Sequence, residues 1–123
     1  MDDVPIELMT AQWGQYDCYD WARALLAIHG YSMPSQEKAA EGLAKTDKAA
    51  WALVLFELNP EDWHVGVVLP GCETFAHMAE NTHVTIERLD NRFWDARIEG
   101  YYRRRDTASP PDSAVAPVEQ CAG

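Results

Sequence analysis

Apolar residues in the first part of the chain recur with helical spacing. Trp21, Leu25 and Ile28 lie at positions i, i+4 and i+7, so they share one face of a helix. The pattern predicts a helix from residue 18 to about residue 29. Gly30 favours its end there, because glycine readily adopts the left-handed conformation in which many helices stop.

Polar residues at the start of this helix fit its cap. Asp17 is suited to be the N-cap, and Asp20, three residues later, occupies the position of a capping-box acid. A second, weaker helix is predicted after Pro34, with Ser35 as its N-cap. Its expected inner residues are Glu37, Ala39, Ala40 and Leu43.

After residue 50 the pattern changes to short apolar or alternating runs, which are typical of strands. Turn residues at 59–62 and 70–73 separate the first three runs. The expected strands are 53–57, 64–69, 74–79, 83–87 and 98–103, with a short helix within 91–97. Helices followed by an antiparallel meander predict an α+β fold.

The chain of 123 residues is the size of one domain. We expect this domain to span residues 1–106. Residues 107–123 contain three prolines and almost no large apolar side chains, so they bury too little surface to offset the entropy cost of ordering. We therefore expect a flexible C-terminal tail, or one that orders only against a partner.

The charge of the chain excludes some partners. Twenty acidic and ten basic residues give a formal net charge of -10, which disfavours nucleic acid and anionic membranes. No apolar run approaches the roughly 18 residues of a membrane helix, so we expect no membrane insertion. Residues 1–5 are acidic and lack an apolar stretch, so we expect no secretory signal.

The three cysteines, Cys18, Cys72 and Cys121, are an odd number without paired spacing, which favours neither a disulfide framework nor a zinc ribbon. Cys18 is the first residue of the predicted helix, where backbone N–H groups and the helix dipole favour a thiolate. A thiolate is a nucleophile. The alternative is a buried cysteine that acts as a small hydrophobic residue.

A nucleophilic cysteine needs a base, and His64 and His77 are the candidates. If residues 70–73 join two antiparallel strands, Gly66 faces His77 and both histidines share one face of the sheet. Their backbones are then diagonal neighbours about 7 Å apart. One ring could take the thiol proton while the other orients it. Alternatively, each histidine is an ordinary surface or core residue.

A metal site is a competing interpretation of the same region. Cys72, His77 and His83 carry suitable donor atoms, but their spacing matches no usual zinc pattern, so we expect no metal. His29 closes the predicted helix, where a partial positive charge suits the last carbonyls, and we expect no catalytic role for it.

Three motifs resemble those of the NlpC-type, papain-like cell-wall cysteine peptidases. Residues 16–23 (YDCYDWAR) resemble the family's Asp-Cys-x-Gly-hydrophobic motif. Residues 64–69 (HVGVVL) resemble its His-Val-Gly-Ile-Tyr strand, and residues 75–78 (FAHM) its Phe-x-His-Ala strand. The likeness covers roughly residues 11 to 104. It implies a papain-like NlpC-type fold with N-terminal helices packed on an antiparallel sheet, and no cofactor.

The end of this region resembles a narrower branch, the short tail-associated peptidases of tailed phages and gene-transfer particles. The segments that carry this likeness are 86–89 (IERL), 93–94 (FW) and 98–103 (IEGYYR). It implies synthesis in the host cytoplasm, a place in the virion at the tail tip, and contact with other tail-tip proteins. The implied role is to open peptidoglycan during cell entry.

The resemblance also implies roles for single residues. Cys18 would be the nucleophile, His64 the general base and His77 the orienting residue. The substrate would be an amide bond in a peptidoglycan stem peptide. Weaker assignments to the substrate site are Tyr16, Asp20 and Gly66.

Two other functions stay open at this stage. Asp20 stands where the family has glycine, and its negative charge works against a thiolate. A catalytically silent structural or assembly component of a phage-type tail is therefore the alternative function. A papain-like acyltransferase or amidase on another substrate is a third hypothesis, because one fold supports several chemistries.

Overall fold

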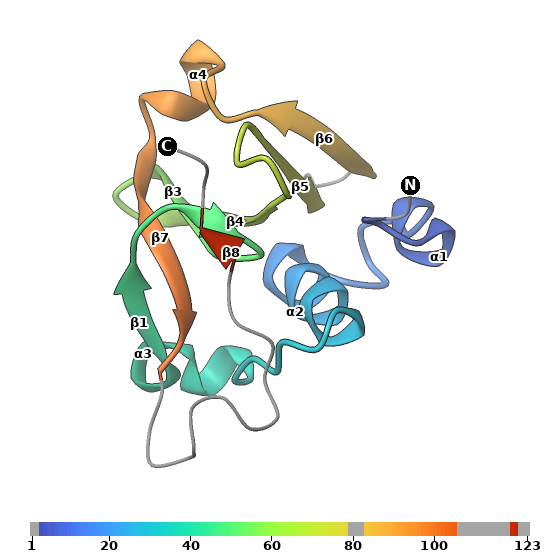
Figure 1. Cartoon of the computed structure of the whole chain (residues 1–123). Coiled ribbons are helices and arrows are strands. Elements are labelled where there is room, and N and C mark those ends of the chain that lie inside the picture. The colour runs from blue at the N-terminus through green and yellow to red at the C-terminus, as the bar shows by residue number, and fades with distance from the viewer. Residues whose placement is uncertain (1–2, 79–82, 106–118, 121–123) are drawn as a thin grey trace.

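A computed structural model of the chain describes residues 3–78, 83–105 and 119–120 (Figure 1). Its helices are α1 (Ile6–Met9), α2 (Cys18–Ile28), the 3₁₀ helix η1 (Gln36–Lys38), α3 (Ala39–Gly42) and α4 (Arg92–Asp95). Its strands are β1 (Leu43–Thr46), β2 (Ala49–Ala50), β3 (Leu53–Asn59), β4 (Asp62–Val68), β5 (Thr74–Met78), β6 (Val84–Arg88), β7 (Ile98–Arg104) and β8 (Glu119–Gln120). None of the described helices is long and apolar enough to cross a membrane.

The main sheet has six antiparallel strands in the order β1-β7-β3-β4-β5-β6. Four consecutive strands, β3 to β6, form the predicted meander. The last predicted strand, β7, does not extend the meander beyond β6 but returns to pair with β3. The predicted α+β class is confirmed, whereas α1, β1 and β2 were not predicted.

Three predicted boundaries in this region shift. Strand β4 begins at Asp62, two residues earlier than predicted, because Asn59 accepts hydrogen bonds from the backbone of Glu61 and Asp62 and closes a tight hairpin. His83 lies before β6 and forms only an isolated bridge with Gln12. The predicted helix within 91–97 is confirmed as the shorter α4.

Helix α2 has the predicted caps. The side chain of Asp17 accepts a 2.8 Å hydrogen bond from the backbone N–H of Asp20. At the other end Gly30 has a φ of 94°, and the backbone N–H of Tyr31 donates to the carbonyl of Leu26 at 2.9 Å. This second bond is the Schellman arrangement, which closes a helix through a left-handed glycine.

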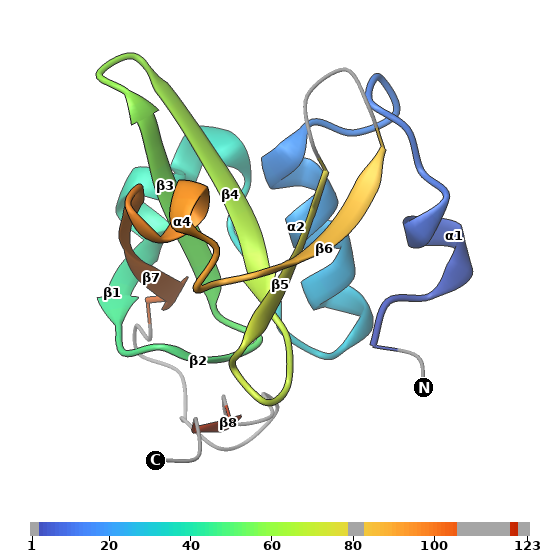
Figure 2. The same cartoon turned by 90° about the horizontal axis from the view of Figure 1, so that it is seen from above.

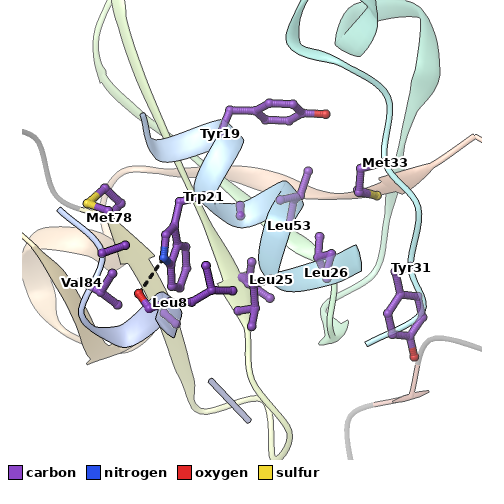
Figure 3. Close-up of a cluster of buried hydrophobic side chains, with 14 of the residues drawn as sticks. Leu8, Tyr19, Trp21, Leu25, Leu26, Tyr31, Met33, Leu53, Met78 and Val84 are labelled. Atoms are coloured by element: carbon purple, nitrogen blue, oxygen red, sulfur yellow. Dashed lines mark hydrogen bonds between the residues drawn. The ribbon is translucent and has the colours of Figure 1, made fainter. Parts of the chain in front are cut away.

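One face of α2 is fully buried against β4 and β5 (Figure 2). Trp21 and Leu25 lie on it as predicted, but Ile28 is 56% exposed, so its place in the buried stripe was wrong. Ala22 and Leu26 complete the buried stripe instead. Ile28, the last residue of the helix, then faces solvent. Figure 3 shows this cluster, in which Trp21 Nε1 also donates to the Leu8 carbonyl.

The second predicted helix is shorter than expected. It is split into η1 and α3, and Leu43 belongs to β1 instead of the helix, which corrects the prediction. The helix ends at Gly42 in contact with Pro34: a Cβ at this glycine would lie 2.8 Å from two atoms of the proline ring. A side chain does not fit there, so glycine is required where the helix ends.

The sheet carries apolar residues on both faces. Val67 and Ala76 point to the α2 face, while their neighbours Val68 and Phe75 point to the opposite face, which Trp94 of α4 covers. Figure 1 shows α4 above and α2 below β4 and β5.

Part of the predicted C-terminal tail has a described backbone. Residues 119–120 form β8, which pairs with β2 in a separate two-stranded sheet. Residues 106–118 and 121–123 lie outside the described residues. The predicted boundary between domain and tail therefore stays a prediction.

Candidate active site

The hairpin of β4 and β5 sets the register of both histidines. Val67 pairs with Ala76 and Val68 with Phe75, and the backbone N–H of Leu69 donates to the Thr74 carbonyl at 3.0 Å. This is the predicted register. Continued by one residue, it places Gly66 opposite His77.

Gly66 is buried against His77 and Phe75. A Cβ at this position would lie 2.7 Å from Phe75 Cδ2 and 3.3 Å from the Cβ of His77. The first distance is shorter than atoms tolerate, so only glycine fits without displacing the ring. The predicted substrate-site residue therefore has a steric role beside the histidines, and no described contact ties it to a substrate.

His64 and His77 are hydrogen-bonded to each other. His64 Nε2 and His77 Nδ1 are 2.7 Å apart, and the rings meet edge-on with an interplanar angle of 83°. His64 is 7% exposed and His77 is 1% exposed. The structure thus brings these two candidates together in a buried pair.

Three further side chains, those of Glu87, Thr85 and Trp94, form hydrogen bonds on the side of His77 that faces away from His64. His77 Nε2 lies 2.7 Å from Glu87 Oε2 and 3.0 Å from Thr85 Oγ1. The indole N–H of Trp94 donates to the other Glu87 oxygen at 3.0 Å. The sequence motifs predicted a catalytic role for none of these three residues.

A signal for Thr85 and Glu87 was present in the strand pattern. The stretch 83–87 alternates polar and apolar residues, and β6 pairs with β5 so that Thr85 faces His77 and Glu87 faces Phe75. Residues two apart on a strand share a face. The pairing of β5 with β6, once assumed, would have placed both side chains beside His77.

Aromatic rings surround the histidine pair. The Trp94 ring stacks on His64 at a centroid distance of 5.5 Å and meets His77 edge-on at 5.1 Å. Phe56 and Phe75 pack against the same rings. This apolar surrounding removes water from the histidines and strengthens the hydrogen bonds that they make.

Burial keeps both histidines neutral. The pKa of His64 is lowered to about 4, mainly by desolvation and further by the charge interaction with His77. The negative charge of Glu87 has the opposite effect and raises this pKa. Burial also lowers the pKa of His77, against the hydrogen bond and charge of Glu87. Both rings are therefore free bases at neutral pH, which is the form that accepts a proton.

Glu87 is the charged member of the cluster. Its partial burial raises its pKa, but the hydrogen bonds from His77 and Trp94 outweigh this and leave the pKa below its usual value. The carboxylate is thus ionised at neutral pH and accepts from both partners.

Cys18 is the first residue of α2 and, among the described residues, the free cysteine. Burial raises the pKa of its thiol, and the charge of Asp17 adds to this. The backbone N–H groups of Val65, Tyr19 and Cys18 itself lower the pKa, but by less. The backbone N–H groups at the helix start thus favour a thiolate, as expected, but desolvation is the larger effect and leaves the pKa of the thiol raised.

The contact with Val65 places the sulfur of Cys18 beside β4. Val65 directly follows His64, so the thiol lies against the backbone of the strand that carries the candidate base. Among the described contacts, none joins Cys18 to the ring of His64 or of His77. The charge of Asp17, which directly precedes Cys18, is an acidic contribution that raises the pKa of this thiol.

The other two weak candidates lie at the start of α2. Asp20 is exposed, and its described contact is the backbone bond to Asp17. Tyr16 is half-buried, packs against the cluster on the α2 face and forms an isolated bridge with Trp13. No described contact ties either residue to His64.

The residues considered for a metal are not gathered. Cys72 is disulfide-bonded, which the odd number of cysteines did not predict, and Cys121 lies outside the described residues. In the described ranges no three His, Cys, Asp or Glu side chains are placed to hold a metal ion. His29 caps α2, bonds the Asp3 carbonyl through Nε2 at 2.7 Å and stacks on Trp51.

Comparison with known proteins supports the fold. No protein-family model and no curated protein matches this sequence. A solved structure from Staphylococcus aureus, described as similar to a lipoprotein of the NLP/P60 family, superposes with a TM-score of 0.54 at 20% sequence identity. The match covers 74% of this chain and 32% of that chain, so this chain spans about a third of that protein's length. Together with the α2 helix on an antiparallel sheet, this likeness shows that the chain has the papain-like, NlpC-type α+β fold.

Proposed function

We propose that this protein is a cysteine peptidase that hydrolyses amide bonds in peptidoglycan stem peptides. Cys18 is the nucleophile, His64 the general base and His77 the residue that orients it. The observation that carries the proposal is the 2.7 Å bond between two buried, neutral histidines on the strands next to the Cys18 helix. A neutral imidazole held by a second side chain is the arrangement that activates a thiol.

The reaction begins from a neutral thiol and a neutral imidazole. His64 removes the Cys18 proton as the sulfur bonds to the carbonyl carbon, and the carbonyl π electrons move to its oxygen. The Cys18 backbone N–H, at the start of α2, is the candidate donor to that oxyanion. The C–N bond then breaks, and the leaving amine takes the proton from His64. Water, deprotonated by His64, then bonds to the thioester carbon, the C–S bond breaks, and the Cys18 sulfur takes the proton back from His64 as the new carboxyl product leaves.

The charge states favour proton transfer during attack over a preformed ion pair. Burial raises the pKa of Cys18 and lowers the pKa of His64 to about 4, so a resting thiolate with an imidazolium is unfavourable. General base catalysis contributes typically 10²–10⁴-fold to such a step. In the proposed mechanism the proton therefore leaves the thiol as the sulfur attacks the carbonyl carbon.

The resemblance of three motifs to NlpC-type peptidases supports peptidoglycan as the substrate. The solved neighbour, described as an NLP/P60 family protein, agrees with that direction. The likeness of residues 86–103 to tail-associated peptidases supports a place at the tip of a phage-type tail, where other tail proteins are the partners. An acidic chain gains no attraction to an anionic wall, so delivery by a particle fits its net charge of -10.

Digestion of purified peptidoglycan tests the activity. Wild-type protein, a Cys18→Ala variant and a His29→Gln control are incubated with the same cell walls, and released fragments are identified by mass spectrometry. We expect stem-peptide fragments from the wild type and the control and none from Cys18→Ala. Equal release by Cys18→Ala would refute the assignment of the nucleophile.

A structural tail component without turnover is the second candidate function. The raised pKa of Cys18 favours it, because an unreactive thiol is what a silent protein would carry. The same digestion separates the two: no release by the wild type, from peptidoglycans of several chemotypes, favours the structural role. If the protein is instead a papain-like amidase or acyltransferase, a screen of acyl substrates other than peptidoglycan would show turnover.

A further inference from the structure

We propose that Glu87 is a positioning residue that fixes the tautomers of both histidines and so leaves His64 Nδ1 free to take the thiol proton. The proposal rests on the proposed function and adds a fourth residue to its site. Glu87 does not touch the reacting atoms. It acts through His77, which separates it from the base.

The hydrogen bonds assign the protons in sequence. An ionised carboxylate only accepts, so the 2.7 Å contact with Glu87 requires a proton on His77 Nε2. A neutral ring holds one proton, so His77 Nδ1 is then an acceptor. The 2.7 Å bond to His64 therefore takes its proton from His64 Nε2. His64 Nδ1 remains as the basic nitrogen, and the described hydrogen bonds of this ring use Nε2 alone.

Trp94 holds the carboxylate in place. Its indole N–H is a donor only, and it occupies Glu87 Oε1 at 3.0 Å, while Oε2 faces His77. The carboxylate is one-third exposed, whereas His77 behind it is almost fully buried. Because His77 is neutral, this contact is a hydrogen bond to a charged acceptor and not an ion pair, and we assign it the role of setting the direction of the two buried protons.

The glutamine variant gives a sharp test because an amide has one acceptor and two donors at fixed ends. In Glu87→Gln, the Trp94 N–H attracts the amide oxygen, which turns the amide NH₂ toward His77. We expect His77 Nε2 to accept from this NH₂ in preference to donating to Thr85 Oγ1, 3.0 Å away, so that its proton moves to Nδ1 and His64 accepts at Nε2. The His64 proton is then on Nδ1, so the basic nitrogen is lost.

Activity on stem peptides is the first readout. We expect kcat/KM to fall at least about 100-fold in Glu87→Gln, the scale of effect known for a misplaced histidine tautomer. In Glu87→Gln/Trp94→Phe the indole donor is absent, the amide can reverse, and we expect at least about tenfold recovery over Glu87→Gln. No recovery in a folded double variant would overturn the tautomer argument.

Glu99→Gln is the matched control. Glu99 lies on the same sheet, its side chain is 31% exposed against 33% for Glu87, and it accepts a 2.7 Å bond from Tyr102. It has no described contact with either histidine. We expect its substitution to leave kcat/KM unchanged, and thermal melts of all variants check the fold.

The ¹⁵N NMR shifts of the imidazole nitrogens test the proposal without any substrate. We expect the Nε2–H form for both His64 and His77 in the wild type and the Nδ1–H form for both in Glu87→Gln. An Nδ1–H form in the wild type, or unchanged forms in the variant, would overturn it. If the tautomers switch while the wild type cleaves no peptidoglycan, the proposal stands and the proposed function fails.

Discussion

Acidification should weaken the folded state through His64, because burial holds the pKa of this ring at about 4 against a usual value of 6.5. Between these two values the unfolded chain binds a proton that the folded protein does not. The contribution of His64 to the free energy of unfolding is therefore fully present above pH 6.5 and is lost as the pH falls toward 4. Between pH 7 and pH 4.5, a shift of this size costs about 2–3 kcal/mol of unfolding free energy.

The loss of unfolding free energy between pH 7 and pH 4.5 should differ between the wild type and His64→Gln. The glutamine NH₂ can replace His64 Nε2 as the donor to His77 Nδ1, so the variant keeps this hydrogen bond but no longer titrates. His77 is present in both proteins, and its own contribution largely cancels in the comparison.

Urea unfolding followed by far-UV circular dichroism, at pH 7 and pH 4.5, measures this difference. We expect the wild type to lose about 2–3 kcal/mol more than His64→Gln over this interval. Equal losses would refute the reasoning, since they would mean that His64 titrates alike in the folded and unfolded states. A larger loss in the variant would contradict even the direction of the shift.

Three other changes give separate tests. Gly66→Ala should lower activity and destabilise by about 1–3 kcal/mol, because its Cβ would meet Phe75 at 2.7 Å; urea unfolding measures this, and an unchanged midpoint would contradict it. Asp17→Asn keeps a helix cap but removes a charge that raises the pKa of Cys18, so alkylation of the thiol by iodoacetamide at pH 8 should be faster than in the wild type. Trp21→Phe should cost about 1–3 kcal/mol, seen as a lower melting temperature, because it shortens a fully buried side chain and leaves the Leu8 carbonyl, among the described contacts, with only the 3.3 Å bond from the Ala11 backbone.

Local patterns predicted the elements that carry the site. Asp17 and Gly30 are strong local signals, so both ends of α2 were placed within a residue. The turn at residues 70–73 fixed the hairpin register and, with it, the shared face of His64 and His77.

The missed elements depend on the assembled fold. Strand β1 is only partly buried, and each of its residues pairs with a β7 residue that lies at least 55 positions later, so its strand signal in the sequence is weak. The outward turn of Ile28 depends on which side of α2 faces the sheet. Helical spacing alone could not show whether the buried face continues from Trp21 and Leu25 toward Ile28 or toward Leu26.

The charge state of the thiol was also beyond local reasoning. Position at the start of α2 is visible in the sequence, and the backbone N–H groups there do lower the pKa of Cys18. The larger effect is burial, which depends on the packing of α2 on β4. Glu87 was missed for a similar reason, because its partners His77 and Trp94 meet it only in the folded sheet.

Hydrolysis through Cys18 is tested most directly by digesting purified peptidoglycan in water enriched in ¹⁸O. If the enzyme forms a thioester that water resolves, each new carboxyl end gains one ¹⁸O atom, and Cys18→Ala releases no such ends. New ends without ¹⁸O, or labelled ends from Cys18→Ala, would contradict a hydrolase that acts through this cysteine.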